Sequence, residues 1–110
     1  MKRKTEVTSS SGNVFKDLGV ASPDEALAKA ELTTRIAALI TGQGLTQSAG
    51  AKILGIDQPK VSALLRGRLS GFSTERLMKF LTALGQDVQI VVRARSKQAR
   101  GRGHLRVVSG

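Results

Sequence analysis

Apolar residues in the first half of the chain recur with the spacing of an amphipathic α-helix. Four of them fall at positions i, i+4, i+7 and i+8 and so share one helix face: Leu32, Ile36, Leu39 and Ile40. Ser22 can cap the start of this helix, Pro23 suits its first position, and the glycines at 42 and 44 end it. The pattern predicts a helix over 23–41.

Three shorter helices follow, each preceded by a residue that favours the N-cap and followed by a glycine. The capping residues are Thr46, Asp57 and Ser73, and the glycines are Gly55, Gly67 and Gly85. These signals predict helices over 47–54, 58–66 and 74–84. The last of them has an apolar face, formed by Leu77, Phe80, Leu81 and Leu84.

The hydrophobic period changes from that of a helix to that of a strand after Gly85. Val88, Ile90 and Val92 alternate with other residues, which predicts a strand over 88–93. A lone strand is unstable, and the chain offers no obvious second strand. We therefore expect Val88, Ile90 and Val92 to pair with a second copy of the chain in a homodimer.

The fold class predicted by these elements is all-α: a small bundle of four main helices plus a C-terminal strand. We expect one domain over 13–93, with a short apolar arm within 13–19 packed on it. The flanking segments, 1–12 and 94–110, are basic and rich in small polar residues, and we expect a flexible N-terminal tail and a disordered C-terminal tail.

The net charge of the chain narrows the range of expected partners. The chain has 18 Lys and Arg but only 8 Asp and Glu, which gives a formal net charge of +10. Excess positive charge on a small protein favours nucleic acid as the partner. More than half of this charge lies in residues 88–110, which contain no acid. Non-specific phosphate contacts are expected from Arg93, Arg95, Lys97, Arg100 and Arg102.

Several classes of function are excluded by composition. The chain has three Phe and no Trp or Tyr, too few for a surface that stacks single-stranded bases. It has no Cys and one His, His104, so thiolate zinc sites, Cys nucleophiles and two-histidine metal sites within one chain are ruled out. We expect a cytoplasmic protein without catalytic residues, metal, cofactor, secretory signal or membrane span.

The segment 46–67 has the pattern of a helix-turn-helix. Ala51 is small where two helices must cross, Gly55 makes the turn, and three apolar residues hold the second helix: Ile56, Val61 and Leu64. On its exposed face Gln58 can read a base edge, Lys60 can contact a guanine or a phosphate, and Arg66 can contact a phosphate or a groove edge. A helical hairpin that merely packs is the alternative, and the basic bias of the segment favours DNA.

The same segment resembles the Cro/C1-type (Xre) helix-turn-helix, and the longer region 13–93 resembles small HigA-like antitoxins and regulators. The longer resemblance rests on Asn13–Gly19, Gln58–Arg68, Gly71-Phe72-Ser73 and Val88–Arg93. It implies a dimeric repressor of its own operon, with a RelE/HigB-type toxin as neighbour and partner. One departure is Gly50, where this fold commonly has a larger apolar residue. Because glycine costs about 1 kcal/mol in a helix interior, the helix over 47–54 is expected to be soft.

The expected contacts to operator DNA combine the exposed positions with those that the resemblance implies. They are Gln47, Gln58, Pro59, Lys60, Ser62, Ala63, Arg66 and Arg68. Three alternatives stay open. One is a solitary Xre-type regulator, and another is an RNA-binding or nucleoid-type protein that ignores sequence. The third is a module that only neutralises a toxin and whose DNA binding is incidental. The repressor needs the face of 58–66, whereas the non-specific binder needs only 93–106.

Overall fold

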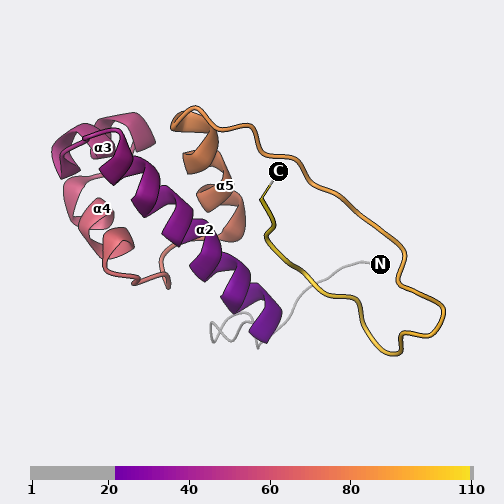
Figure 1. Ribbon diagram of the computed structural model, residues 1–110. Coiled ribbons are helices and arrows are strands. Elements are labelled where there is room, and N and C mark those ends of the chain that lie inside the picture. Colours follow the sequence, from indigo (N-terminus) through magenta and orange to yellow (C-terminus); the bar gives the residue numbers. More distant parts are fainter. Residues whose placement is uncertain (1–21, 110) are drawn as a thin grey trace.

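The structure is a computed structural model that describes residues 22–109. Its helices are α2 (Pro23–Gly42), α3 (Gln47–Leu54), α4 (Gln58–Leu65) and α5 (Thr74–Ala83), as Figure 1 shows. Their bounds agree with the predicted ranges to within one residue, so the all-α prediction is confirmed. The predicted N-terminal tail over 1–12 and the packed arm within 13–19 lie outside the described residues.

The core lies where α2 packs against α5 and α4, and where α3 packs against α4 and α5. Its largest fully buried side chains come from three helices: Ile36, Leu64, Leu77 and Val61. Burying a side chain of this size contributes about 1.5–3 kcal/mol. Every predicted core position in α5 is buried, and Leu39 of α2 is partly buried against the same cluster. The predicted apolar faces therefore do form the core.

Each helix begins at the capping residue that the sequence predicts. The side-chain oxygens of Ser22, Thr46, Asp57 and Ser73 each accept a hydrogen bond, of 3.0–3.1 Å, from the backbone N–H three residues further on. These bonds satisfy backbone donors that have no partner inside a helix, which contributes about 1 kcal/mol each.

The predicted strand over 88–93 is absent from the described chain, where this segment is extended and unpaired. A strand requires a ladder of backbone hydrogen bonds, and residues 22–109 supply no second segment to form one. Alternation in the sequence predicted an extended conformation but could not supply a partner. As a result Ile90 and Val92 are 74% and 90% exposed.

Beyond α5 the chain leaves the bundle, makes a long excursion and comes back toward α2 (Figure 1). Residues 104–109, here called the C-terminal return, lie along α2. The Asp24 carboxylate oxygen Oδ2 lies 3.0 Å from Nδ1 of His104 and accepts a 3.3 Å hydrogen bond from the Leu105 N–H. Near the other end, Nη2 of Arg35 donates to the Ser109 hydroxyl at 3.0 Å.

The C-terminal return matches the length of the α2 segment that it follows. The eleven rises of helix from Asp24 to Arg35 span about 16 Å, and so do the five rises of extended chain from His104 to Ser109. Between the two ends Val107 packs against the core. The domain boundary expected at residue 93 stays a prediction, and Val107 lies beyond it.

Within residues 22–109, none of the helices is both long and apolar enough to cross a bilayer.

Candidate nucleic-acid interface

The turn between α3 and α4 is fixed by backbone hydrogen bonds. The N–H groups of Gly55 and Ile56 both donate to the Ala51 carbonyl oxygen, at 2.9 and 3.1 Å. Gly55 has φ +71°, a left-handed conformation that strains any residue with a side chain. The predicted turn is therefore present, and it sets the direction in which α4 leaves α3.

The interface between α3 and α4 is lined by small and branched residues. Ala51 is buried, as predicted, and Val61 is fully buried. Gly50 is also buried, yet a Cβ built on it would meet only the Ile40 Cδ1 at 3.8 Å and the Val61 Cγ1 at 3.9 Å. These are ordinary van der Waals distances. Close packing therefore does not require a glycine at this position.

One face of α4 is buried and the opposite face is open to solvent. Val61 and Leu64 point into the core, while Gln58, Pro59 and Lys60 are exposed at the start of the helix. The remaining predicted DNA contacts lie around this face. Ser62 and Ala63 are half-buried, and Gln47, Arg66 and Arg68 are exposed.

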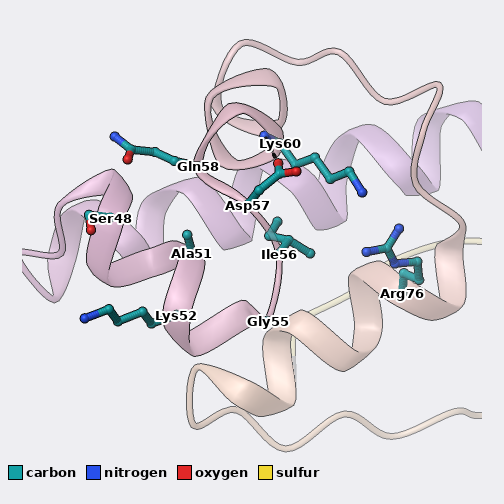
Figure 2. Close-up of a pocket in the computed structure, with 9 residues that line it drawn as sticks. All are labelled: Ser48, Ala51, Lys52, Gly55, Ile56, Asp57, Gln58, Lys60 and Arg76. Atoms are coloured by element: carbon teal, nitrogen blue, oxygen red, sulfur yellow. Dashed lines mark hydrogen bonds between the residues drawn. The ribbon is translucent and has the colours of Figure 1, made fainter.

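A shallow hollow, here called the basic hollow, lies between α3, the start of α4 and α5 (Figure 2). It contains two of the predicted DNA contacts, Gln58 and Lys60, whereas Gln47, Arg66 and Arg68 do not line it. Three polar residues that line it were not predicted from the sequence: Ser48, Lys52 and Arg76. The hollow depends on how three helices meet, so no local pattern in the sequence indicates it.

Arg76 is held in place by two aromatic rings. Its guanidinium carbon lies 5.5 Å from the ring centroid of Phe72 and 5.5 Å from that of Phe80. The rings themselves pack edge to face with centroids 5.9 Å apart. Such cation–π contacts orient a guanidinium while leaving its N–H donors available. The spacing of Phe72, Arg76 and Phe80, four residues apart, was a sequence signal that could have indicated this contact.

The electrostatics of the basic hollow favour an anion. Three cationic side chains line it against one acid, Asp57. The Asp57 carboxylate is already used, because it accepts a 3.0 Å hydrogen bond from the Lys60 N–H and so caps α4. In Figure 2 the Lys60 side chain extends toward Arg76, and the Gln58 side chain points away from both. Two cations converge here with a helix N-terminus, which suits a phosphate group.

The predicted phosphate-contact residues near the C-terminus are all exposed: Arg93, Arg95, Lys97, Arg100 and Arg102. They lie on the excursion, which extends away from the helix bundle on the side remote from α3 and α4 (Figure 1). The structure therefore does not bring them together with the basic hollow. One of them has an internal role, since Nη1 of Arg95 donates hydrogen bonds to the carbonyl oxygens of Arg100 and Arg102.

The contacts of the C-terminal return with α2 change the pKa of one carboxyl group, that of Asp24. The hydrogen bond with His104, followed by the bond from the Leu105 N–H, lowers the pKa of Asp24 below its usual value. This group lies on α2 and is separate from the basic hollow. Among the described residues, no group of three or more His, Asp or Glu side chains is arranged to hold a metal ion.

Comparison with known proteins identifies similar chains. Residues 14–93 match the family model described as "Helix-turn-helix domain". A solved structure named "Putative XRE Family Transcriptional Regulator" is 45% identical in sequence and superposes with a TM-score of 0.72. The match covers 79% of this chain and 97% of that chain. A search of curated proteins gives no significant match.

Proposed function

The chain belongs to the helix-turn-helix domain family, as an XRE-family transcriptional regulator, and from this we propose that it represses transcription by reading a specific DNA sequence with α4. It is a DNA-binding protein of a non-enzymatic family. The observation that carries the proposal is the exposed start of α4, where Gln58, Pro59 and Lys60 face solvent above a buried helix face.

Gln58 is the residue that we assign to base reading. Its side-chain amide can donate to and accept from the edge of an adenine in the major groove. It lies at the first position of α4, the part of a recognition helix that reaches the bases. The neighbouring positions complete the surface that we assign to DNA: Gln47, Pro59, Lys60, Ser62, Ala63, Arg66 and Arg68.

The test of this proposal is a comparison of specific and random DNA. A binding site is first selected from a pool of random duplexes with the wild-type protein. The Gln58→Ala variant is then expected to lose about 1–3 kcal/mol on the selected site and little on random duplexes. Gln86→Ala is the matched control, because Gln86 is exposed and lies outside both α4 and the segment 88–93. Equal losses on both kinds of DNA would reject base reading by Gln58.

We propose that the active form is a homodimer in which residues 88–93 of two copies pair as antiparallel strands. The exposed apolar side chains of Val88, Ile90 and Val92 support this, because an unpaired apolar edge favours association. A two-fold dimer also presents two recognition helices to half-sites about 34 Å apart.

We further propose that the domain over 13–93 acts as the antitoxin of a type II toxin–antitoxin pair. In this role it would repress its own operon and neutralise a RelE/HigB-type toxin. The resemblance of 13–93 to HigA-like proteins supports the proposal. The test is to express the adjacent open reading frame with and without this chain. Growth arrest that this chain relieves supports an antitoxin, and the absence of any arrest favours a solitary regulator.

The basic C-terminal segment is proposed to add affinity for duplexes of any sequence through contacts with phosphates. Its contacts are to phosphates, from Arg93, Arg95, Lys97, Arg100 and Arg102. Removal of residues 94–110 is expected to weaken binding to all duplexes and to flatten the salt dependence, because each lost phosphate contact lowers the slope by about 1. An unchanged slope would show that the segment does not touch DNA.

A further inference from the structure

Residues 95–103 form a basic loop that is closed by its own hydrogen bonds. The Ala99 N–H donates to the Ser96 carbonyl oxygen at 3.0 Å, which makes a turn. Nη1 of Arg95 donates to the Arg100 carbonyl oxygen at 2.8 Å and also to that of Arg102. The loop therefore has a defined shape, although every charged side chain in it is exposed.

Arg100 and Arg102 flank a glycine in a left-handed conformation. Gly101 has φ +79°, which residues with side chains rarely adopt. Neither guanidinium has a hydrogen bond or ion pair with any residue in 22–109. Their carbonyl oxygens are held by Arg95, so the backbone between the two side chains is fixed while the side chains are available to a ligand.

The loop is joined to the bundle at both ends. One end continues from α5, and the other leads into the C-terminal return, which Asp24 and Arg35 hold on α2. Figure 1 shows the loop at the far end of the excursion, where no helix covers it. Two attachments restrict its motion more than the single attachment of a free tail.

The type of basic residue changes along the chain. Residues 22–87 contain four Lys and four Arg, whereas residues 88–110 contain five Arg, one Lys and no acid. Phosphates bind either side chain, since Lys serves as a point charge. The narrow minor groove of A·T-rich DNA attracts inserted basic side chains, and a guanidinium is more weakly hydrated than an ammonium. Arg also binds phosphates bidentately, so the bias toward Arg fits contacts with phosphates and insertion into the groove alike.

We propose that the basic loop enters the minor groove of A·T-rich DNA, with the Arg100 and Arg102 side chains lying along the groove. The absence of a side chain at Gly101 lets the backbone approach a groove that is only about 6 Å wide. A guanine places its 2-amino group in this groove, so G·C pairs are disfavoured. The proposal rests on the DNA-binding function above and adds a second reading surface to it.

The experiment uses the full chain and three duplexes of equal length. One is A·T-rich, one is G·C-rich, and the third is the G·C-rich duplex with inosine in place of every guanosine. Inosine lacks the 2-amino group, so its minor groove resembles that of A·T while its major groove keeps the acceptors of guanine. We expect the A·T and inosine duplexes to bind alike, and about fivefold or more tighter than G·C, by fluorescence anisotropy.

Two variants separate groove insertion from phosphate contact. The double variant Arg100→Lys and Arg102→Lys keeps the charge, and it is expected to lose the preference for A·T and inosine duplexes. The control Lys97→Ala is expected to weaken binding to all three duplexes by a similar factor. If the inosine duplex binds like G·C, or if the preference survives in the double variant, the loop binds phosphates only and the proposal is wrong.

A third variant keeps this test distinct from the test of α4. Gln58→Ala is expected to lose binding to the selected site but to keep the preference for A·T and inosine duplexes. The loop proposal is rejected if the wild type binds all three duplexes equally, even where the double lysine variant loses binding to the selected site. That result leaves the α4 proposal standing.

Discussion

Gln43 and Leu84 join the ends of two helices that are adjacent in space but distant in sequence. Nε2 of Gln43 donates a 3.0 Å hydrogen bond to the Leu84 carbonyl oxygen, and both residues are the C-caps of their helices, α2 and α5. The bond satisfies a carbonyl that α5 itself leaves unpaired. It also holds together the two helices that form most of the core.

Replacement of Gln43 by Ala is expected to destabilise the fold by about 1 kcal/mol, because the Leu84 carbonyl loses its partner. In a domain of this size such a loss lowers Tm by about 4–8 °C in a thermal melt followed by circular dichroism. Gln86→Ala, at an exposed position without such a bond and outside the segment 88–93, is the control. A Tm equal to that of the wild type would show that the bond contributes nothing.

Replacement of Gly50 by Ala is expected to stabilise the fold by about 0.4–1 kcal/mol. The site has room for the Cβ, and alanine reduces the conformational freedom of the unfolded chain. Gly55→Ala is the opposite case, because the left-handed φ at Gly55 strains alanine. This variant is expected to destabilise the fold. Urea unfolding of both variants measures the sign of each change in the free energy of unfolding. A destabilised Gly50→Ala would mean that α3 and α4 cannot accommodate the methyl group.

Replacement of Lys52 by Ala is expected to weaken binding to selected and random DNA alike. Lys52 lines the basic hollow, so a phosphate contact there would carry no sequence information. The slope of log K against log salt should fall by about 1. Lys79→Ala is the control, because Lys79 pairs with Glu75 at 3.6 Å and lies outside the hollow. A loss confined to the selected site would instead make Lys52 a base-reading residue.

Replacement of Ile90 by Lys is expected to convert a dimer into a monomer. A charge in the middle of the proposed strand pair opposes its burial, while the helices lose no contact because Ile90 is exposed in the single chain. Sedimentation equilibrium measures the mass, and circular dichroism checks the helices. The control is Gln89→Lys, which adds the same charge on the opposite face of the segment. Identical masses for wild type and Ile90→Lys would contradict the strand-paired dimer.

The attachment of the C-terminal return to α2 is expected to weaken in acid. The pKa of Asp24 is lowered in the folded chain, so its contribution is complete above the unfolded pKa and is lost as the pH falls through the folded pKa. The loss therefore begins below about pH 4. The amide resonance of Leu105, whose N–H bonds to Asp24, reports it in an NMR titration. Asp24→Asn should abolish this titration and Glu25→Gln should preserve it.

The helices were predictable because their signals are local. Caps at Ser22, Thr46 and Asp57 act within three residues, and the apolar periods in α2 and α5 repeat within a turn or two. The pairing of residues 88–93 was not predictable from the sequence. Alternation at Val88–Val92 indicates an extended conformation but does not identify a segment that pairs with it. Pairing is a property of two segments, and the described chain holds only one of them.

The candidate site was predictable only in part, for a related reason. The exposed residues of α4, such as Gln58 and Lys60, follow from the helical period once the buried face is known. Lys52 and Arg76 line the same hollow from α3 and α5, and their presence there depends on how the helices pack. The contact between Asp24 and Leu105 joins segments at opposite ends of the described chain, which no local pattern relates.

The C-terminal return gives the molecule two levels of cooperativity. The hydrogen bond from Leu105 to Asp24 joins residues that are 81 positions apart in the sequence, whereas the capping bonds join residues only 3 positions apart. Contacts of such long range close a large loop, so we expect them to form late in folding, after the helices have docked. Exposed polar bonds and one half-buried valine hold the return, so it can open by sub-global unfolding while the bundle stays intact. Each opening releases one of the two attachments of the basic loop and lengthens its reach.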